Sequence, residues 1–230
     1  MPKARNKSLR RTRPRILILC EGEKTEPLYF KGLKSDPAHK NLTSVIVIGD
    51  TKVNTAKELI DQAIGEQKNA AREGNPYFEI WVVIDKDGYT KHPESFDRAK
   101  MHNINIAFSS VAFEFWILLH FKYTTKVFPK CDDLISYLKK EHLPEYEKKG
   151  QIYDILKDKT CTAVENAKKI RKTSPDLDSS SPPYKINPYT NIDTLVCRLL
   201  HIEDLKDANN NYLKLPPNNW NITLSDLYDI

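Results

Sequence analysis

Acidic side chains gather at two places in the chain where short apolar runs end. Ile16–Cys20 is followed by Glu21–Glu26, and Phe78–Ile84 is followed by Asp85 and Asp87. In extended backbone, residues two apart point the same way, so Asp85 and Asp87 can face one point. Carboxylates this close repel each other and raise each other's pKa unless a cation lies between them. Oxygen ligands without histidine or thiolate favour Mg²⁺ or Mn²⁺.

The alternative is that these acids are solvated turn residues, because the sequence IDKDG is also compatible with a turn. A single D-x-D motif is too short to exclude that alternative. The second acidic cluster, at another expected strand end, is what favours a metal site, since ligands of parallel α/β sheets bind beyond the carboxyl ends of strands.

Glu114 is unusual because it stands inside the apolar sequence FEFWILL. A carboxylate is costly to bury without a partner. Glu114 is therefore expected to reach a metal, to cap a backbone amide from the first turn of a helix, or to face solvent from an amphipathic helix. His120 falls on another face of the same helix and is expected to be a core or surface histidine.

The elements that must position these acids follow from apolar periodicity. Continuous apolar runs predict buried strands, and apolar residues at helical spacing predict helices. The predicted strands are 16–20, 45–48, 78–84 and a weaker 104–108, alternating with helices that begin near Pro27, at a Thr55/Glu58 capping box and near Glu94. Strands alternating with helices predict an α/β fold with a mainly parallel sheet.

The strands are expected to stop after Phe108, leaving a helical C-terminal part. The predicted helices are 111–121, 134–140 capped by Asp132 or Asp133, one opened by a Thr162/Glu165 capping box, and one starting at Thr190 or Asn191; 174–188 is predicted to be an exposed loop. The predicted division is a basic flexible arm at 1–14, a catalytic domain at 15–125, a helical extension at 126–206 packed on it, and a tail at 207–230.

Positive charge is concentrated at the start of the chain. The formal net charge is +5, from 36 Lys and Arg against 31 Asp and Glu. Residues 1–15 hold seven of the cations and no acid, so the rest carries about −2. Such an arm favours an anionic polymer, and nucleic acid in particular, over a simple solubilising tail. The predicted nucleic-acid contacts are Arg5, Lys7, Arg10, Arg11 and Arg13.

Composition excludes several other classes. No stretch approaches the 18 apolar residues of a membrane span, and the basic start has no apolar segment of a secretory signal. The four cysteines lie at 20, 131, 161 and 197, too far apart for a zinc clip, and Cys20 is expected to be a small buried residue. The expected compartment is the reducing cytoplasm, with no membrane partner.

Four motifs in order resemble the RloB family: ILILCEGEKTEPLYF, WVVIDKDG, SSVAFEFWILLHF and NPYTNIDTL. The likeness runs over roughly residues 15 to 200. The family is described as having a Toprim-like fold and is found beside bacterial restriction and abortive-infection genes. Toprim domains place a glutamate after the first strand and an Asp-x-Asp after a later one, and they bind Mg²⁺ for phosphodiester chemistry. The NPYTN segment matches a family motif without an assigned role.

The resemblance implies roles for individual residues. Glu21 matches the glutamate, Asp85 and Asp87 match the pair, and these three would hold one Mg²⁺. Glu26 completes an E-G-x-x-x-E sequence like that of related nucleases, and Glu26 or Glu114 would help to hold a second ion. Glu21 could instead act as a general acid or base without metal. Lys24 and Lys86 could steady phosphate charge or be ordinary solvated lysines.

A metal-dependent nuclease is the expected function, acting on DNA or RNA in anti-phage defence, with other defence proteins as candidate partners. The chain is too short for the strand-passage clamp of a topoisomerase and shows no primase apparatus. Two alternatives stay open. One is a non-catalytic nucleic-acid-binding or regulatory subunit, and the other is phosphotransfer or phosphatase-like chemistry on a small molecule.

Overall fold

The computed structural model describes residues 13–51, 53, 55–86, 91–173, 181–202, 204, 206–207 and 211–214. Its helices and strands follow one another in the order β1 Ile16–Cys20, α1 Thr25–Ser35, η1 Pro37–Ser44, β2 Ile46–Ile48, α2 Ala56–Arg72, β3 Glu79–Asp85, α3 His92–Met101, β4 Asn105–Ser110, α4 Glu114–Leu119, α5 Cys131–Glu141, α6 Tyr153–Leu156, η2 Lys157–Lys159, α7 Thr160–Thr173, η3 Pro183–Lys185, β5 Tyr189–Thr190 and α8 Ile192–Leu200. No helix in the described ranges is long and apolar enough to cross a membrane.

A single five-stranded sheet lies at the centre of the fold, with strand order β2-β1-β3-β4-β5. The first four strands are parallel, and β5 runs antiparallel to β4. The predicted α/β fold with a mainly parallel sheet is therefore confirmed. Because β1 and β3 are parallel neighbours, the residues that follow them emerge at the same edge.

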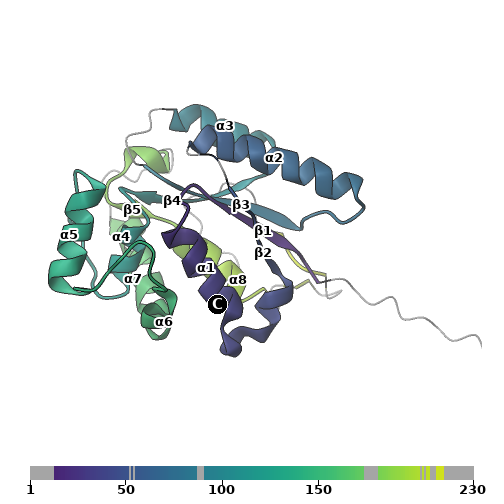
Figure 1. The fold of residues 1–230 in the computed structure, drawn as a ribbon. Coiled ribbons are helices and arrows are strands. Elements are labelled where there is room, and N and C mark those ends of the chain that lie inside the picture. Colours follow the sequence, from purple (N-terminus) through teal and green to yellow (C-terminus); the bar gives the residue numbers. More distant parts are fainter. Residues whose placement is uncertain are drawn as a thin grey trace, which may run out of the picture.

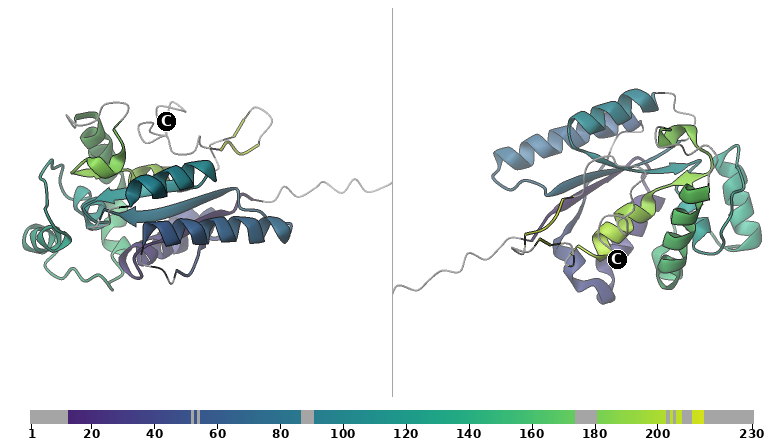
Figure 2. Two further views of the ribbon diagram at one scale, coloured as in Figure 1. Left: turned by 90° about the horizontal axis from the view of Figure 1, so that it is seen from above. Right: turned by 180° about the vertical axis from the view of Figure 1, so that it is seen from behind.

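Helices cover both faces of the sheet (Figure 1). α2, α3 and the short η3 lie on one face, whereas α1, α4, α7 and α8 lie on the other, as the view from behind also shows (Figure 2). Alternate residues of β1 explain its unbroken apolar sequence, because Ile16, Ile18 and Cys20 enter one apolar layer while Leu17 and Leu19 enter the other. Cys20 is buried, as expected.

The helices after residue 126 share an apolar layer with the sheet. Leu134, Leu156 and Ala163 belong to the same buried cluster as Ile16 and Val83. Two buried ion pairs also connect helices of this part to each other and to the sheet. Arg171 on α7 pairs with Asp193 on α8 at 2.6 Å, and Arg198 on α8 pairs with Glu79 on β3 at 2.8 Å. The predicted domain boundary near residue 125 stays a prediction.

The NPYTN segment completes the sheet, which corrects the expectation that strands stop after Phe108. Tyr189 and Thr190 form β5 beside Ser109 and Ser110. The carboxamide of Asn191 then continues the pairing, since its Oδ1 accepts from the Phe108 amide at 2.6 Å and its Nδ2 donates to the Ile106 carbonyl at 3.1 Å. The role of this segment in the fold is thus to seal the edge of β4.

Three predicted helix starts are also corrected. α5 begins at Cys131 after Lys130, so Asp132 and Asp133 lie in its first turn and do not cap it. Thr162 lies inside α7 because that helix already begins at Thr160. α4 covers only Glu114–Leu119, shorter than the predicted 111–121. The Thr55 cap is confirmed, with its hydroxyl accepting from the Glu58 amide.

Candidate metal and phosphodiester site

Four carboxylates meet at the carboxyl edge of the sheet. Glu21 follows β1, Asp85 ends β3, Glu26 lies in the first turn of α1, and Glu114 is the first residue of α4. The backbone amide of Asp85 donates to Glu21 Oε2 at 3.2 Å, which joins the two strand ends directly. The structure therefore brings together four of the five acids that the sequence singled out. The fifth, Asp87, lies outside the described residues.

Gly22 allows Glu26 to turn back over this edge. A Cβ added at Gly22 would collide with both carboxylate oxygens of Glu26. The glycine of the E-G-x-x-x-E sequence is thus a steric requirement of the site, because a side chain there would push the Glu26 carboxylate away. Glu26 itself is only 6% exposed, although it stands in a helical first turn where acids usually face water.

Asp85 carries the clearest electrostatic sign of a cation site. Burial raises the pKa of its carboxyl well above the usual range, and Glu26, Glu114 and Glu21 raise it further, in that order. A hydrogen bond from the Phe113 backbone opposes the shift. Asp85 Oδ1 is buried and has no hydrogen-bond partner within the described ranges. A partly buried carboxylate oxygen among like charges fits a hard divalent cation.

The described carboxylates alone do not complete a metal site. Outside the gaps in the described ranges, no three or more His, Cys, Asp and Glu side chains are grouped so that they could hold a metal ion. The role of Asp87 as a further ligand stays a prediction, because Asp87 lies outside the described residues. Oxygen-only donors, the orphaned Oδ1 and the raised pKa of Asp85 fit Mg²⁺ or Mn²⁺ better than Zn²⁺, which prefers nitrogen and sulfur.

Glu114 does not face solvent. It is 3% exposed, and its Oε1 accepts a hydrogen bond of 2.7 Å from the Tyr146 hydroxyl. Its Oε2 lies 3.9 Å from Cys131 Sγ. These contacts remove the solvent-facing alternative and leave Glu114 as a buried acid whose negative charge is felt by Asp85 and Glu26.

Sequence analysis missed the residues between α5 and α6 that close over the acids. Thr25 Oγ1, in the first turn of α1, donates to the Lys148 carbonyl at 3.2 Å and lies 3.5 Å from the Tyr146 hydroxyl. Partial burial lowers the pKa of the Lys148 ammonium, but Glu114, Cys131 and Glu26 together raise it. Lys148 is thus a positively charged residue that interacts with Glu114 and Glu26. Nothing local in the sequence marks it among its lysine neighbours.

The other predicted site residues lie apart from the acids or outside the described ranges. Lys24 is exposed and Lys86 is partly buried, so their burial does not decide between a phosphate-binding role and ordinary solvated lysines. Arg5, Lys7, Arg10 and Arg11 lie outside the described residues, and Arg13 is exposed just before β1, at the opposite edge of the sheet. His120 is a buried core histidine, with burial lowering its pKa to about 4.

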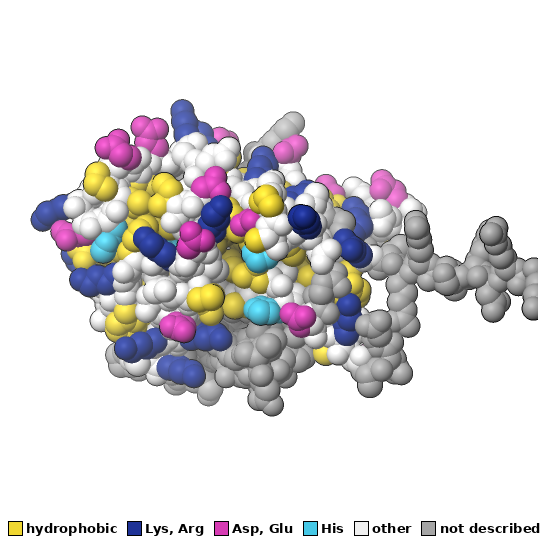
Figure 3. Space-filling view, turned by 90° about the horizontal axis from the view of Figure 1, so that it is seen from below, with side chains coloured by type: hydrophobic (Ala, Val, Ile, Leu, Met, Phe, Trp, Pro, Cys, Tyr) yellow, Lys and Arg dark blue, Asp and Glu magenta, His cyan; other side chains and the backbone are white. Residues whose placement is uncertain are grey.

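Surface charge on the body of the protein is mixed. On the face seen from below, Lys and Arg side chains are interspersed with Asp and Glu side chains (Figure 3). This agrees with the net charge of about −2 for the chain after residue 15. A polyanion is therefore expected to be attracted by the basic arm more than by this face.

The pKa of Glu26 gives a pH dependence that can be measured. Burial raises it from 4.5 to about 7, with Glu114 adding to the shift and Lys148 opposing it. The folded state therefore holds this proton more tightly than the unfolded state, and stability is lost as pH rises from 4.5 to 7. We expect Glu26→Gln to be more stable than the native protein above pH 7, by at most about 3 kcal/mol.

Denaturant unfolding across a pH series checks this expectation. The difference between Glu26→Gln and the native protein should vanish below pH 4.5, where the carboxyl is protonated in both states. Glu23→Gln, at an exposed position in the loop just before α1, is the control and should follow the native protein. If the difference in free energy of unfolding between Glu26→Gln and the native protein does not vary with pH, Glu26 does not bind a proton in a buried environment.

The structure is that of an α/β protein with a mainly parallel sheet and a cluster of acidic side chains beyond the carboxyl ends of its strands. The chain belongs to the RloB family, because the model described as RloB-like protein matches residues 16–199. This match covers both strands that carry the acids, α4, and the NPYTN segment. No curated protein and no solved structure matches the chain.

Proposed function

We propose that this protein is a Mg²⁺- or Mn²⁺-dependent phosphodiesterase that cleaves nucleic acid. The observation that carries the proposal is Asp85, whose buried Oδ1 lacks a partner among the described residues while three other carboxylates raise its pKa. Such a site favours binding a divalent cation, which neutralises the repulsion. The family's Toprim-like description, with the same acids in the same order, points to phosphodiester chemistry.

Each residue has a defined part in this proposal. Glu21, Asp85 and Asp87 would hold the ion, with Glu26 and Glu114 available to a second one. When bound, divalent ions neutralise the scissile phosphate and lower the pKa of an attacking water. Tyr146 fixes the Glu114 carboxylate through its 2.7 Å hydrogen bond. Glu26, with its pKa of about 7, can hold or release a proton near neutral pH.

The proposed setting is anti-phage defence in the bacterial cytoplasm, with other defence proteins as candidate partners. It rests on the family resemblance. The basic arm would hold the nucleic acid, and the acids would cleave it.

Cleavage assays on labelled single-stranded DNA, duplex DNA and RNA test the activity. We expect cleavage of at least one substrate with Mg²⁺ or Mn²⁺, none with EDTA, and none by Asp85→Asn. Cleavage that persists in EDTA would overturn the metal site. Binding without cleavage under any metal would instead favour the non-catalytic subunit. Release of phosphate from mononucleotides alone would favour the small-molecule alternative.

The basic arm is expected to set affinity without affecting turnover. If about four of its cations contact phosphates at once, deleting Met1–Arg13 should flatten the log–log salt dependence of duplex binding by about three to four units. Turnover at saturating substrate should stay the same because the acids lie at the other edge of the sheet. A labelled oligonucleotide titrated across a salt series, with full-length and truncated protein, gives the slope.

Two outcomes would contradict this role of the arm. An unchanged slope would mean that the arm serves another purpose, such as a protein partner. A loss of turnover with an unchanged slope would place the arm in the active site. The structure leaves this open to experiment, since residues 1–12 lie outside the described ranges.

A further inference from the structure

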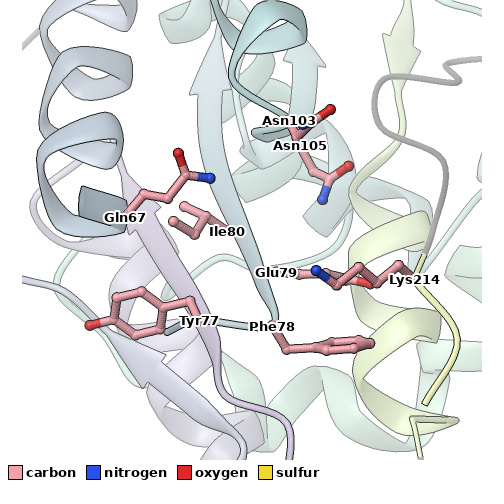
Figure 4. Close-up of a pocket in the computed structure, with 8 residues that line it drawn as sticks. All are labelled: Gln67, Tyr77, Phe78, Glu79, Ile80, Asn103, Asn105 and Lys214. Atoms are coloured by element: carbon pink, nitrogen blue, oxygen red, sulfur yellow. The ribbon is translucent and has the colours of Figure 1, made fainter. Parts of the chain in front are cut away.

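A pocket opens at the opposite edge of the sheet, where β3 and β4 begin (Figure 4). Its volume is about 300 Å³, at the lower end of the range of small-molecule sites. We call it the amino-edge pocket, and its polar lining consists of Gln67, Tyr77, Glu79, Asn103, Asn105 and Lys214. The four described acids of the proposed metal site are not among its lining residues.

Asn105 is the distinctive group of this pocket. Its side chain is 6% exposed, and its carboxamide forms no hydrogen bond with any described residue. The carboxamide points into the pocket in Figure 4. The Asn105 atoms are not among the fully buried polar atoms without a partner, so they reach the pocket opening, where a ligand can replace water and pair with them.

The charges of the lining restrict what that partner can be. Glu79 is neutralised by Arg198 at 2.8 Å and also accepts from the Trp81 indole at 3.1 Å. Lys214 is the one described cation that lines the pocket, and it lies 5.3 Å from the centre of the Phe78 ring. A pocket with aromatic rings, carboxamides and a single ammonium suits a neutral planar heterocycle that carries at most one phosphate.

We propose that the amino-edge pocket binds a nucleobase, adenine in preference to the others, with Asn105 pairing to its edge and Lys214 near an attached phosphate. A carboxamide presents a donor and an acceptor side by side, and adenine offers the matching N7 acceptor and N6 donor. Guanine presents two acceptors at the same positions, so one of the two hydrogen bonds is lost. The ring of Phe78, on the same side of the pocket as Lys214 in Figure 4, supplies an aromatic surface on which a base can stack.

The base could belong to a free mononucleotide or to an unpaired position in a strand. The strand has structural support because the basic arm enters the fold at this edge, where Ile16 pairs with Glu79. Arg15 also lies here, with its guanidinium 4.5 Å from the centre of the Tyr77 ring. This inference does not depend on the proposed catalysis, which uses the other edge.

Calorimetry in EDTA, where metal-dependent cleavage is switched off, tests the base preference. We expect AMP to bind at least about tenfold more tightly than GMP, CMP or UMP, as one well-formed pair of hydrogen bonds provides. Asn105→Asp, which replaces the donor with a charged acceptor, should weaken AMP binding at least about tenfold. Asn69→Asp makes the same charge change at an exposed position of α2 and should leave binding unchanged.

Further variants separate the parts of the proposal. Asn105→Ala should lose affinity like Asn105→Asp, and thermal melts of both confirm that they fold. Lys214→Met should make AMP and adenosine bind equally. Asn105-dependent binding of an unpaired-adenine oligonucleotide but not AMP would identify a strand as the source, and the reverse a free nucleotide. Binding of neither, equal binding of all bases, or full affinity in folded Asn105 variants would overturn the proposal.

Discussion

Asp85→Asn is expected to remove Mg²⁺ binding and to lower any phosphodiesterase activity by at least about a hundredfold, since even residues that only orient metal ligands contribute 10- to 100-fold. The same change should leave the metal-free protein as stable as the native one or more stable. Burial and three neighbouring carboxylates raise the pKa of Asp85, so an uncharged amide removes an unfavourable charge from the folded state. Loss of function combined with retained or increased stability is what distinguishes a metal ligand from a structural acid.

Thermal melts with and without Mg²⁺ give the measurement. The native protein should gain about 2.7 kcal/mol at a metal concentration 100 times the dissociation constant, and Asp85→Asn should gain nothing. Asp97→Asn, at an exposed position on α3, is the matched control and should gain as much as the native protein. If the native protein gains no stability from Mg²⁺ or Mn²⁺, the metal site is wrong. Asp87→Asn is expected to behave like Asp85→Asn.

Glu114→Gln is expected to lower activity at least about tenfold, whereas Glu94→Gln should change nothing. The two glutamates differ in environment, since Glu114 is buried against Tyr146 and Glu94 is exposed on α3. The amide keeps the shape of Glu114 but removes its charge, and a hydrogen bond to a charged group contributes about 1.5–3 kcal/mol. Activity and melting temperature are measured for both variants in the same buffer.

Tyr146→Phe extends this test to the partner of Glu114. Removing the hydroxyl leaves Glu114 Oε1 without its 2.7 Å donor, so we expect a loss of activity in the same direction. Tyr137→Phe, on α5, removes a hydroxyl without such a contact to the acids and serves as its control. Equal, negligible effects at Glu114, Tyr146 and Glu94 would mean that the buried acid has no part in the site.

The sheet could be predicted from the sequence because its central strands have an easily recognised apolar pattern. The strands β1 and β3 are continuous apolar runs, and this pattern arises when both faces of a strand are covered. Once the strands were parallel, the acids after them had to share an edge, which is why Glu21 and Asp85 could be placed together. Glu114 was recognisable only as a carboxylate in an apolar context.

The remaining features depend on tertiary contacts that leave no local pattern. The strand β5 has two residues, too few for any periodicity, and its pairing depends on the Asn191 carboxamide. The buried Arg198 resembles any surface arginine in the sequence, because its partner Glu79 is 119 residues away. Tyr146 and Lys148 reach the acids only because the chain between α5 and α6 returns to the first turn of α1.

The position of β1 between the two edges has a consequence for substrate length. The basic arm joins β1 at its amino end, and Glu21 follows at its carboxyl end, so five residues separate them. At about 3.3 Å per residue this is roughly 17 Å. Stacked bases rise about 3.4 Å each along a duplex, so roughly five base pairs cover the same distance. A nucleic acid held at both edges therefore needs a footprint of at least that length, and fragments shorter than it can occupy one edge at a time.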